Sequence, residues 1–539
     1  MRHGVSCGSG TPGRCARACR RAARRAFASG SAALALAFTV QGGAARAIAA
    51  QALPGNEGEG GSAPSLARAI ETITERPPLD GVHWGIHVVD AGTGAVLYAK
   101  NARKRFVPAS NMKIAVSAAA LLARGPEWRF TTEIWSVAPV DEAGRVRGNL
   151  VIPATGDPTL SARFHDDDEA PLRALVDSLR ARGITSVDGA LVIDRSAWDT
   201  LAVPGSWMVG NIAEGFSAAP ATFAIGEGAT RVEIRGAEEV GEPAVVRRLG
   251  GGTPGFVTGE VVSVARSDTT ANEIEFDWRP ESGVHRIRGG WHVERVDTLA
   301  IATRLAEREA GVRLLQLLDS AGIPVRDGVR LVADTAATVG GGCLAGSVRG
   351  CEGAVPLVRL ESPTLLEITR ALLEPSQNWI TEQVMRSLGA DAGPLASRVA
   401  ARDTIVAILA REAGVDTLDL SLRDGSGLSA YNLVTPQALT AILARMLETP
   451  WAAGWRDALA APGEEESTLE HRLGGFEATL QAKTGTISNV NALSGYLDDA
   501  AGRTLIFSIL TNGSGLPAPV VQRVMDEVVA TIARHPPDD

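Results

Sequence analysis

The stretch Val107-Pro108-Ala109-Ser110-Asn111-Met112-Lys113 decides the fold, and it leads into an alanine- and leucine-rich run from Ile114 to Arg124. Pro108 and Ser110 stand where a helix would begin, so we expect a helix that starts near Ser110. Residues three apart share one face of a helix, which puts Lys113 one turn from the Ser110 hydroxyl. A serine hydroxyl is a poor nucleophile without a base in reach. The spacing therefore makes Ser110 a candidate nucleophile and Lys113 its base.

Ser-x-x-Lys taken alone has little specificity. It should occur about once or twice by chance in a chain of this length at average composition, and a helix cap beside a solvated lysine explains it as well. Lysine usage favours the catalytic interpretation, because arginine is abundant whereas lysine is rare. The lysines of the whole chain are Lys100, Lys104, Lys113 and Lys483.

A second lysine opens Lys483-Thr484-Gly485-Thr486, which follows an alternating run from Glu477 and so lies at the end of a predicted strand. Lysine suits this place if a compact charge must face a substrate, and Gly485 would let a substrate approach the backbone closely. The alternative is a strand-edge lysine before a turn.

Between the two lysines lies Ser376-Gln377-Asn378, preceded by Pro375 within a helical pattern from Thr364 to Leu388. A polar interruption of the helix explains this tripeptide equally well when it is considered alone.

The order Ser-x-x-Lys, Ser-x-Asn, Lys-Thr-Gly is far more specific than any one motif, and it resembles the penicillin-binding-protein and serine β-lactamase superfamily. The flanking text narrows the resemblance to the low-molecular-mass class C penicillin-binding proteins, the D-alanyl-D-alanine carboxypeptidase and endopeptidase family (peptidase family S13). It runs from about Ser65 to the C-terminus. The motifs are Val107 to Lys113, Gly156-Asp157-Pro158-Thr159-Leu160, Asp424-Gly425-Ser426-Gly427-Leu428-Ser429 and Ala482-Lys483-Thr484-Gly485-Thr486.

The resemblance implies an exported enzyme that hydrolyses peptidoglycan peptides through an acyl-enzyme and that β-lactam antibiotics acylate. Ser110 would attack the carbonyl of the penultimate D-alanine while Lys113 removes its proton. Ser376 would relay a proton to the leaving amine, and Asn378 would hold the substrate amide. No cofactor and no metal are implied.

The same resemblance assigns the Lys-Thr-Gly region to substrate binding, with Gly485 leaving room for it. Lys483 would supply positive potential, and Thr484 and Thr486 would bind the terminal carboxylate. The backbone N–H groups of Ser110 and Thr486 would form the oxyanion hole.

One segment departs from the family pattern, in which a tryptophan after Pro-Gly is followed closely by acidic residues. Here Trp207 follows Pro204-Gly205 and is itself followed by Met208-Val209-Gly210-Asn211. The preference for a particular stem peptide is therefore open.

Three alternatives compete with the carboxypeptidase interpretation. A β-lactamase would need a second base for fast deacylation, and no convincing Glu-x-x-x-Asn loop is found at the expected place. A non-catalytic wall-binding scaffold would have no reason to retain each polar group of the site. A Ser-His-Asp site using His292 lacks a nucleophile-elbow pentapeptide.

The predicted fold class is α+β, with an antiparallel sheet flanked by helices and a large, mainly β insertion. Hydrophobic and turn patterns predict a hairpin, further strands and several helices. The hairpin spans Val82 to Ala99; strands are expected at Gly148 to Pro153, Ala190 to Ile193, Arg231 to Arg235, Ala492 to Leu497 and Thr504 to Thr511. Helices are expected at Leu299 to Gly322, the one helix of the insertion, and at Thr364 to Leu388, Arg398 to Ala413, Thr435 to Leu447 and Val520 to Arg534.

A chain of 539 residues exceeds what one compact core usually holds. We expect a catalytic domain in two parts, residues 51–140 and 340–539, interrupted by inserted, mainly β domains over residues 141–339. Residues 1–50 are predicted to be a signal peptide.

The prediction of a signal peptide, or leader, rests on the order of three segments: basic residues, then apolar residues, then small residues. Six arginines between Arg14 and Arg25 precede an apolar run from Phe27 to Val40, and small residues follow. Arg24-Arg25-Ala26-Phe27 also allows a twin-arginine signal. No cysteine after the apolar run suits a lipid anchor, so we expect a soluble periplasmic or extracellular protein.

Removal of this leader leaves Cys343 and Cys351 as the cysteines of the mature chain. Outside the cytoplasm, two nearby cysteines in a Gly-rich stretch are expected to form a disulfide. Zinc is the alternative, but no histidine is near enough in sequence to complete a ligand set.

The net charge limits the classes of partner that the protein can bind. The leader carries eight arginines and no acids, so its loss lowers the formal net charge from −9 to about −17. An acidic protein is poorly suited to nucleic acid or to anionic membranes, which basic patches bind.

Overall fold

The computed structural model describes residues 65–199, 203–249, 257–268, 274–279, 284–390 and 396–535. The predicted signal peptide lies outside these ranges. Within them, no helix combines the length and apolar character needed to cross a membrane.

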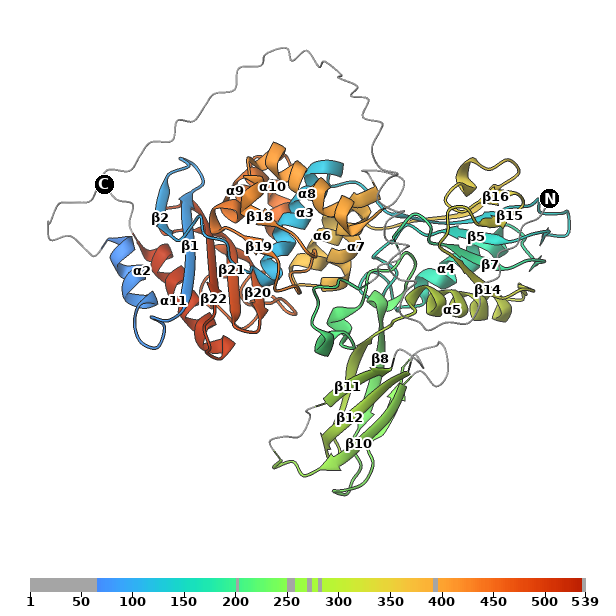
Figure 1. Ribbon diagram of the computed structural model, residues 1–539, viewed down its shortest axis with the longest axis horizontal. Helices are drawn as coiled ribbons and strands as arrows, with labels where there is room; N and C mark the ends of the chain where they lie inside the picture. The colour runs from blue at the N-terminus through green and yellow to red at the C-terminus, as the bar shows by residue number, and fades with distance from the viewer. Residues whose placement is uncertain are drawn as a thin grey trace, which may run out of the picture. The chain divides into compact units, whose positions relative to one another are not determined.

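The first and last parts of the described chain share one five-stranded antiparallel sheet, ordered β2-β1-β22-β21-β20 (Figure 1). β1 pairs with β22 from His83↔Asn512 to Asp90↔Leu505, so the two ends of the chain meet at the middle of the sheet. β20 is an edge strand and carries Lys483 to Thr486. The bounds are β1 His83–Asp90, β2 Val96–Lys100, β20 Leu480–Ile487, β21 Val490–Asp498 and β22 Thr504–Asn512.

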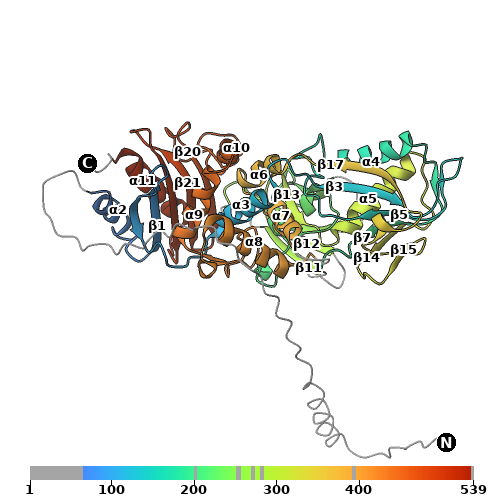
Figure 2. The ribbon, with the colours of Figure 1, turned by 90° about the horizontal axis from the view of Figure 1, so that it is seen from above.

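Helices cover both faces of this sheet and create two hydrophobic cores. α2 (Leu66–Thr74) and α11 (Ala518–Arg534) pack together on one face, as Figure 2 shows. The other core centres on α3 (Met112–Arg124), whose residues 112–121 are all buried. Around it pack α6 Leu365–Leu373, α7 Asn378–Gly389, α8 Arg398–Ala413, α9 Pro436–Leu447 and α10 Ala452–Asp457, with the short pair β18 Leu420–Ser421 and β19 Leu433–Val434.

A second five-stranded sheet, ordered β14-β7-β5-β3-β17, packs against α4 (Ala170–Ala181) and α5 (Ala306–Ser320). Its strands begin at Thr131 and end at Glu361, so β3 and β17 lie outside the predicted insertion limits of 141 and 339. The limits themselves stay a prediction. The strands are β3 Thr131–Ser136, β5 Leu150–Pro153, β7 Leu191–Asp194, β14 Val329–Val332 and β17 Val355–Glu361, with the minor pair β4 Arg145–Val146 and β6 Ser186–Val187.

Two three-stranded sheets, β13-β8-β9 and β10-β12-β11, complete this region and share a small apolar core around Trp291. The bounds are β8 Ala229–Arg235, β9 Val245–Arg248, β10 Val257–Val264, β11 Ile274–Arg279, β12 Val284–His292 and β13 Val296–Ala302.

Two helix predictions need correction, and one helix of the inserted region was not predicted. The helix expected from Leu299 begins only at Ala306, because Val296–Ala302 pairs with β8 as a strand. The pattern from Thr364 to Leu388 is two helices, broken before Asn378. α4 was missed, although Leu172, Leu175, Val176 and Leu179 recur at helical spacing on its buried face.

Cys343 and Cys351 form a disulfide. Cys343 belongs to the hairpin of β15 (Thr338–Gly340) and β16 (Cys343–Leu344), and it is buried in one apolar cluster with Val137 and Val151. The bond therefore closes a short loop that precedes β17.

Peptide mapping without reduction, on protein exported to an oxidising compartment, should recover Cys343 linked to Cys351. Replacing both cysteines by serine should lower the free energy of unfolding of this region by about 2–3 kcal/mol, because the reduced chain gains loop entropy when unfolded. Urea unfolding measures the loss. Recovery of two free thiols from the exported protein would contradict the prediction.

Candidate active site

Ser110 sits in the single turn Ala109–Asn111 that leads into α3, and it is half-buried. The turn is tight. Ala109 has φ 46°, a left-handed conformation that few non-glycine residues adopt, and Ser376 across the site has φ 64°. Gly427 packs so closely that a Cβ there would lie 1.8 Å from the Ala109 carbonyl oxygen. Such local strain is typical of functional sites.

Lys113 is fully buried one turn further along α3. Its Nζ donates to Asn378 Oδ1 at 2.7 Å and to the Ser426 carbonyl oxygen at 2.7 Å, and it lies 2.9 Å from Ser110 Oγ. The Asn378 amide is fixed by its own Nδ2, which donates to the Phe216 carbonyl oxygen at 2.9 Å. Its oxygen must therefore face Lys113.

These contacts suit a neutral amine. A neutral lysine has two N–H donors and one lone pair; the two acceptor oxygens of Asn378 and Ser426 take the donors, which leaves the lone pair toward the Ser110 hydroxyl. Burial lowers the Lys113 pKa to about 7, against the opposing charges of Asp424 and Glu382. Lys113 can therefore accept a proton from Ser110 near neutral pH.

Ser376 and Asn378 flank the start of α7, where Gln377 caps the helix by accepting from Ile380 N at 3.1 Å. Both residues line one cavity of about 440 Å³ together with Ser110 and Thr486. Ser110, the Ser376–Asn378 motif and the end of the Lys483–Thr486 motif, far apart in the sequence, thus meet at this cavity. Lys113 and Lys483 are buried and do not line it.

Lys483 is fully buried on β20, and its Nζ donates to the Thr484 carbonyl oxygen at 3.0 Å. Desolvation and the nearby Lys113 charge hold the pKa of Lys483 well below its usual range. A carboxylate entering the site would stabilise the charged form and reverse this shift.

The rest of the Lys-Thr-Gly motif lies against Ser110. A Cβ on Gly485 would lie 2.9 Å from Ser110 N, so the missing side chain lets β20 approach the nucleophile's backbone. Thr484 is buried outside the cavity lining, whereas Thr486 is exposed in it. Its hydroxyl accepts from Gln522 Nε2 at 3.1 Å.

Asn111 ties β20 to the catalytic helix, a role that its sequence position did not reveal. Its fully buried side chain lies 2.7 Å from Ser494 Oγ. With Nδ2 turned toward β20 it donates to the Lys483 carbonyl oxygen at 2.8 Å.

Two buried acids hold the loop that carries Ser426. Glu382 Oε1 accepts from the N–H groups of Gly425 and Ser426, each at 2.8 Å, and burial beside Asp424 raises the Glu382 pKa. Asp424 accepts from Gly427 N at 3.0 Å and from Trp207 Nε1 at 2.8 Å. Sequence reasoning assigned neither acid a role; only the Asp-Gly-Ser-Gly motif marked Asp424.

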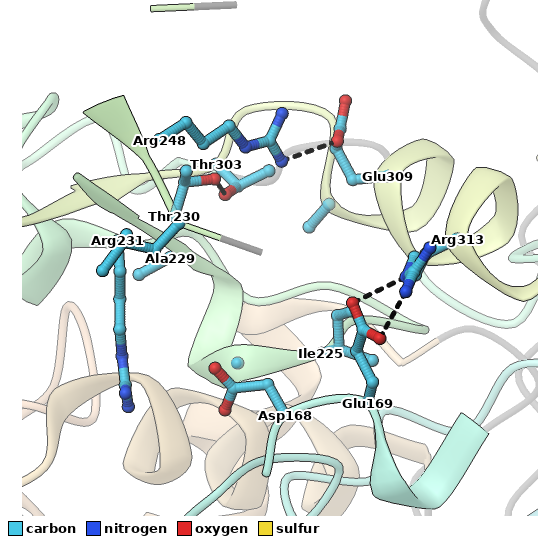
Figure 3. A pocket seen from close by; sticks show the side chains of 13 residues that line it. Asp168, Glu169, Ile225, Ala229, Thr230, Arg231, Arg248, Thr303, Glu309 and Arg313 are labelled. Atoms are coloured by element: carbon cyan, nitrogen blue, oxygen red, sulfur yellow. Dashed lines mark hydrogen bonds and ion pairs between the residues drawn. The ribbon is translucent and has the colours of Figure 1, made fainter. Parts of the chain in front are cut away.

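A second cavity, of about 210 Å³, contains no predicted site residue (Figure 3). Four of its charged side chains form two pairs: Arg248 contacts Glu309 at 3.0 Å, and Arg313 Nε contacts Glu169 at 2.6 Å. Among the residues shown by the structure, no group of three or more His, Cys, Asp or Glu is arranged to hold a metal.

Comparisons with known proteins identify relatives that match most of the chain. The chain is 31% identical to the D-alanyl-D-alanine carboxypeptidase of Actinomadura sp. over 502 residues, 88% of each chain. It is 26% identical to carboxypeptidase DacB of Mycolicibacterium smegmatis over 480 residues, 87% of this chain and 83% of the relative. The crystal structure of penicillin binding protein 4 from Haemophilus influenzae superposes with a TM-score of 0.74 at 22% identity, covering 86% of this chain and 99% of that one.

These matches confirm the predicted α+β fold and the predicted class of serine carboxypeptidase. The model of the D-Ala-D-Ala carboxypeptidase 3 (S13) family matches residues 66–535, nearly the whole described chain. The chain therefore belongs to the D-Ala-D-Ala carboxypeptidase 3 (S13) family.

Proposed function

We propose that this enzyme hydrolyses the bond between the two terminal D-alanines of peptidoglycan stem peptides, and the corresponding cross-links, through an acyl-enzyme on Ser110. The observation that carries the proposal is the 2.9 Å contact between Lys113 Nζ and Ser110 Oγ, in a cavity shared with Ser376 and Thr486. The relative from Actinomadura is named for the same carboxypeptidase activity.

Acylation begins when neutral Lys113 takes the proton of Ser110 Oγ, which bonds to the carbonyl carbon of the penultimate D-alanine. The carbonyl oxygen of the substrate becomes negative and is stabilised by the backbone N–H groups of Ser110 and Thr486. Collapse of the tetrahedral intermediate breaks the C–N bond, and Ser376 passes the proton taken up by Lys113 to the leaving amine. Asn378 holds Lys113 and the substrate amide.

Deacylation uses one water molecule, which adds to the ester carbonyl and releases Ser110 as its hydroxyl. Lys483 and the hydroxyl of Thr486 hold the terminal carboxylate of the substrate, and Gly485 keeps β20 close to Ser110. Thr484, which was predicted to share this role, is buried outside the cavity lining. A β-lactam carries an amide and a carboxylate of similar placement and acylates Ser110 in the same way. A β-lactam complex is known for the Haemophilus influenzae protein.

The substrate lies in the cell wall, and the predicted signal peptide over residues 1–50 would deliver the enzyme there as a soluble periplasmic or extracellular protein. N-terminal sequencing of the exported protein tests this. A mature chain that still begins with residues 1–50 would contradict export by cleavage.

Ser110→Ala should abolish covalent labelling by a fluorescent penicillin and lower the free energy of unfolding by only about 1 kcal/mol. Lys113 keeps its two other acceptors in this variant. Denaturing gels measure the label, and thermal unfolding measures the stability. Labelling of the alanine variant at another residue would show that Ser110 is not the nucleophile, and rapid loss of label from the unmodified enzyme would indicate a β-lactamase.

Acylation of Ser110 should accelerate as pH rises through about 7, because Lys113 gains its free lone pair only above its lowered pKa. The measurement is the second-order rate constant of penicillin acylation across about pH 5 to 9. A rate that is flat or falling through neutrality would contradict this role of Lys113.

Two variants serve as controls for the pH profile. Lys483→Arg keeps a positive charge at position 483 across the whole pH range, so a rise in rate that is due to Lys113 should remain. Asn378→Asp places a carboxylate against Lys113 and should move the rise to higher pH.

Lys483→Ala should lower the acylation rate about a hundredfold or more while the unfolding curve changes little, because the lysine acts through charge beside the substrate carboxylate. Lys483→Arg keeps the charge with a different shape and hydration, and should recover part of the loss. The rates are measured with a penicillin and with a D-alanyl-D-alanine peptide. Wild-type acylation of both substrates by the alanine variant would contradict the assignment.

A further inference from the structure

The cavity shown in Figure 3, of about 210 Å³, is lined only by residues of the inserted region, between positions 168 and 313. Its walls come from four segments: the residues before α4, the turn that leads into β8, the end of β9 and the start of α5. Sites for drug-sized ligands typically have about 300–1,000 Å³, so an occupant of this cavity would be smaller.

Six charged side chains line this cavity, three arginines and three acids, so their formal charges cancel. Four of them form two ion pairs, each with one member on α5. The two that remain are Arg231 on β8 and Asp168 in the segment before α4 (Figure 3). Among the residues that the structure describes, neither takes part in an ion pair. One positive and one negative group are therefore open to a ligand.

The Asp168 carboxylate is held through one oxygen and leaves the other available. Oδ1 accepts from Ala162 N at 2.8 Å. Oδ2 accepts no hydrogen bond within the described ranges and lies close to Gly226, on which a Cβ would be 3.2 Å from it. Because Gly226 has no side chain, the space beside this oxygen stays open. Arg231 is exposed, and its guanidinium likewise has no acceptor in that part of the chain.

The rest of the lining offers apolar surface and hydroxyls that are already paired. Thr230 and Thr303 are buried, and their hydroxyls share a hydrogen bond of 2.9 Å. Ile225 and Leu249 add apolar surface. A ligand with a single charge would match one of the two open groups and leave the other unpaired, whereas a small zwitterion matches both. A free α-amino acid has this chemistry: a carboxylate for a guanidinium, an ammonium group for a carboxylate, and a small side chain.

The wall at Gly226 continues to the catalytic Ser376–Asn378 motif. Glu227, the next residue, accepts a hydrogen bond through its carboxylate from Gln377 Nε2, in the middle of that motif. Glu227 has φ 59°, a left-handed conformation that costs energy in a residue with a Cβ, and such strain is found in switch regions. A ligand that contacts Gly226 therefore acts next to a strained residue that is bonded to the motif.

We infer that this cavity binds a free α-amino acid, with its carboxylate on Arg231 and its ammonium group on Asp168, and that binding alters the acylation of Ser110 through residues 226–227. The site itself rests on the composition and contacts of the cavity. The choice of D-alanine as the probe rests on the proposed function, since the proposed hydrolysis releases D-alanine.

Equilibrium dialysis with radiolabelled D-alanine tests the site. The enzyme is first acylated with a penicillin, so that D-alanine cannot enter the active site. One molecule of D-alanine should bind per chain. Propionate and ethylamine carry one charge each, and they should compete for the site at least about tenfold more weakly than unlabelled D-alanine. Absence of D-alanine binding, or equal competition by propionate, would overturn the zwitterion site.

Two variants and a matched control locate the site. Arg231→Met and Asp168→Asn should each weaken D-alanine binding at least about tenfold; an amide oxygen at position 168 can still accept from Ala162 N, so the local fold is kept. Arg235→Met is the control, because Arg235 also lies on β8, pairs with Glu233 and is absent from the lining. Unchanged binding in either cavity variant, or an equal loss in the control, would overturn the assignment. If no penicillin label forms, the proposed function fails, and the same variants decide the site in unlabelled enzyme.

The second-order rate constant of penicillin acylation tests the coupling to Ser110. Saturating D-alanine should change this rate constant in the unmodified enzyme by about fivefold or more relative to its effect on Arg231→Met. Competition by D-alanine inside the active site is common to both proteins, so the difference between them measures the cavity alone. Equal effects of D-alanine on the two proteins would overturn the coupling.

Discussion

A lysine amine buried without a carboxylate in contact is the constraint on which the rest of the site depends. Burial favours the neutral form of Lys113, and a neutral amine needs acceptors for two N–H groups. Asn378 and the Ser426 carbonyl supply them. The start of α7 and the loop from Asp424 to Ser429 must therefore be placed as accurately as the nucleophile. Glu382 and Asp424 hold that loop by accepting hydrogen bonds from its backbone N–H groups.

The inserted region takes part in this placement. Its Phe216 carbonyl orients the Asn378 amide, and its Trp207 indole anchors Asp424. Both contacts reach residues that touch Lys113 or support its acceptor. A change in the 207–216 segment can therefore alter the basicity of Lys113 although the segment does not contact the lysine.

The sequence allowed the fold class, the family, the central sheet and the three motifs to be predicted, because each rests on local spacing or on a rare residue type such as lysine. The predicted helix of residues 299–322 began too early, since the strand Val296–Ala302 is set by pairing with β8 rather than by its own residues. Asn111 and Glu382 also escaped prediction. Their functions depend on contacts with β20 and with the 425–426 backbone. Contacts between segments that are distant in sequence produce no recognisable motif.

The pairing of β1 with β22 has a consequence for biosynthesis. Val107 and Asn512, which join the Ser110 segment to the end of that pair, stand 405 positions apart. During translation Ser110 is synthesised early. The strand that carries Lys483, β20, and the strand that completes the sheet, β22, are synthesised among the last. Contacts of such long sequence separation form slowly and only in a finished chain. The order of translation therefore keeps the protein without a working site until its final strands have been made.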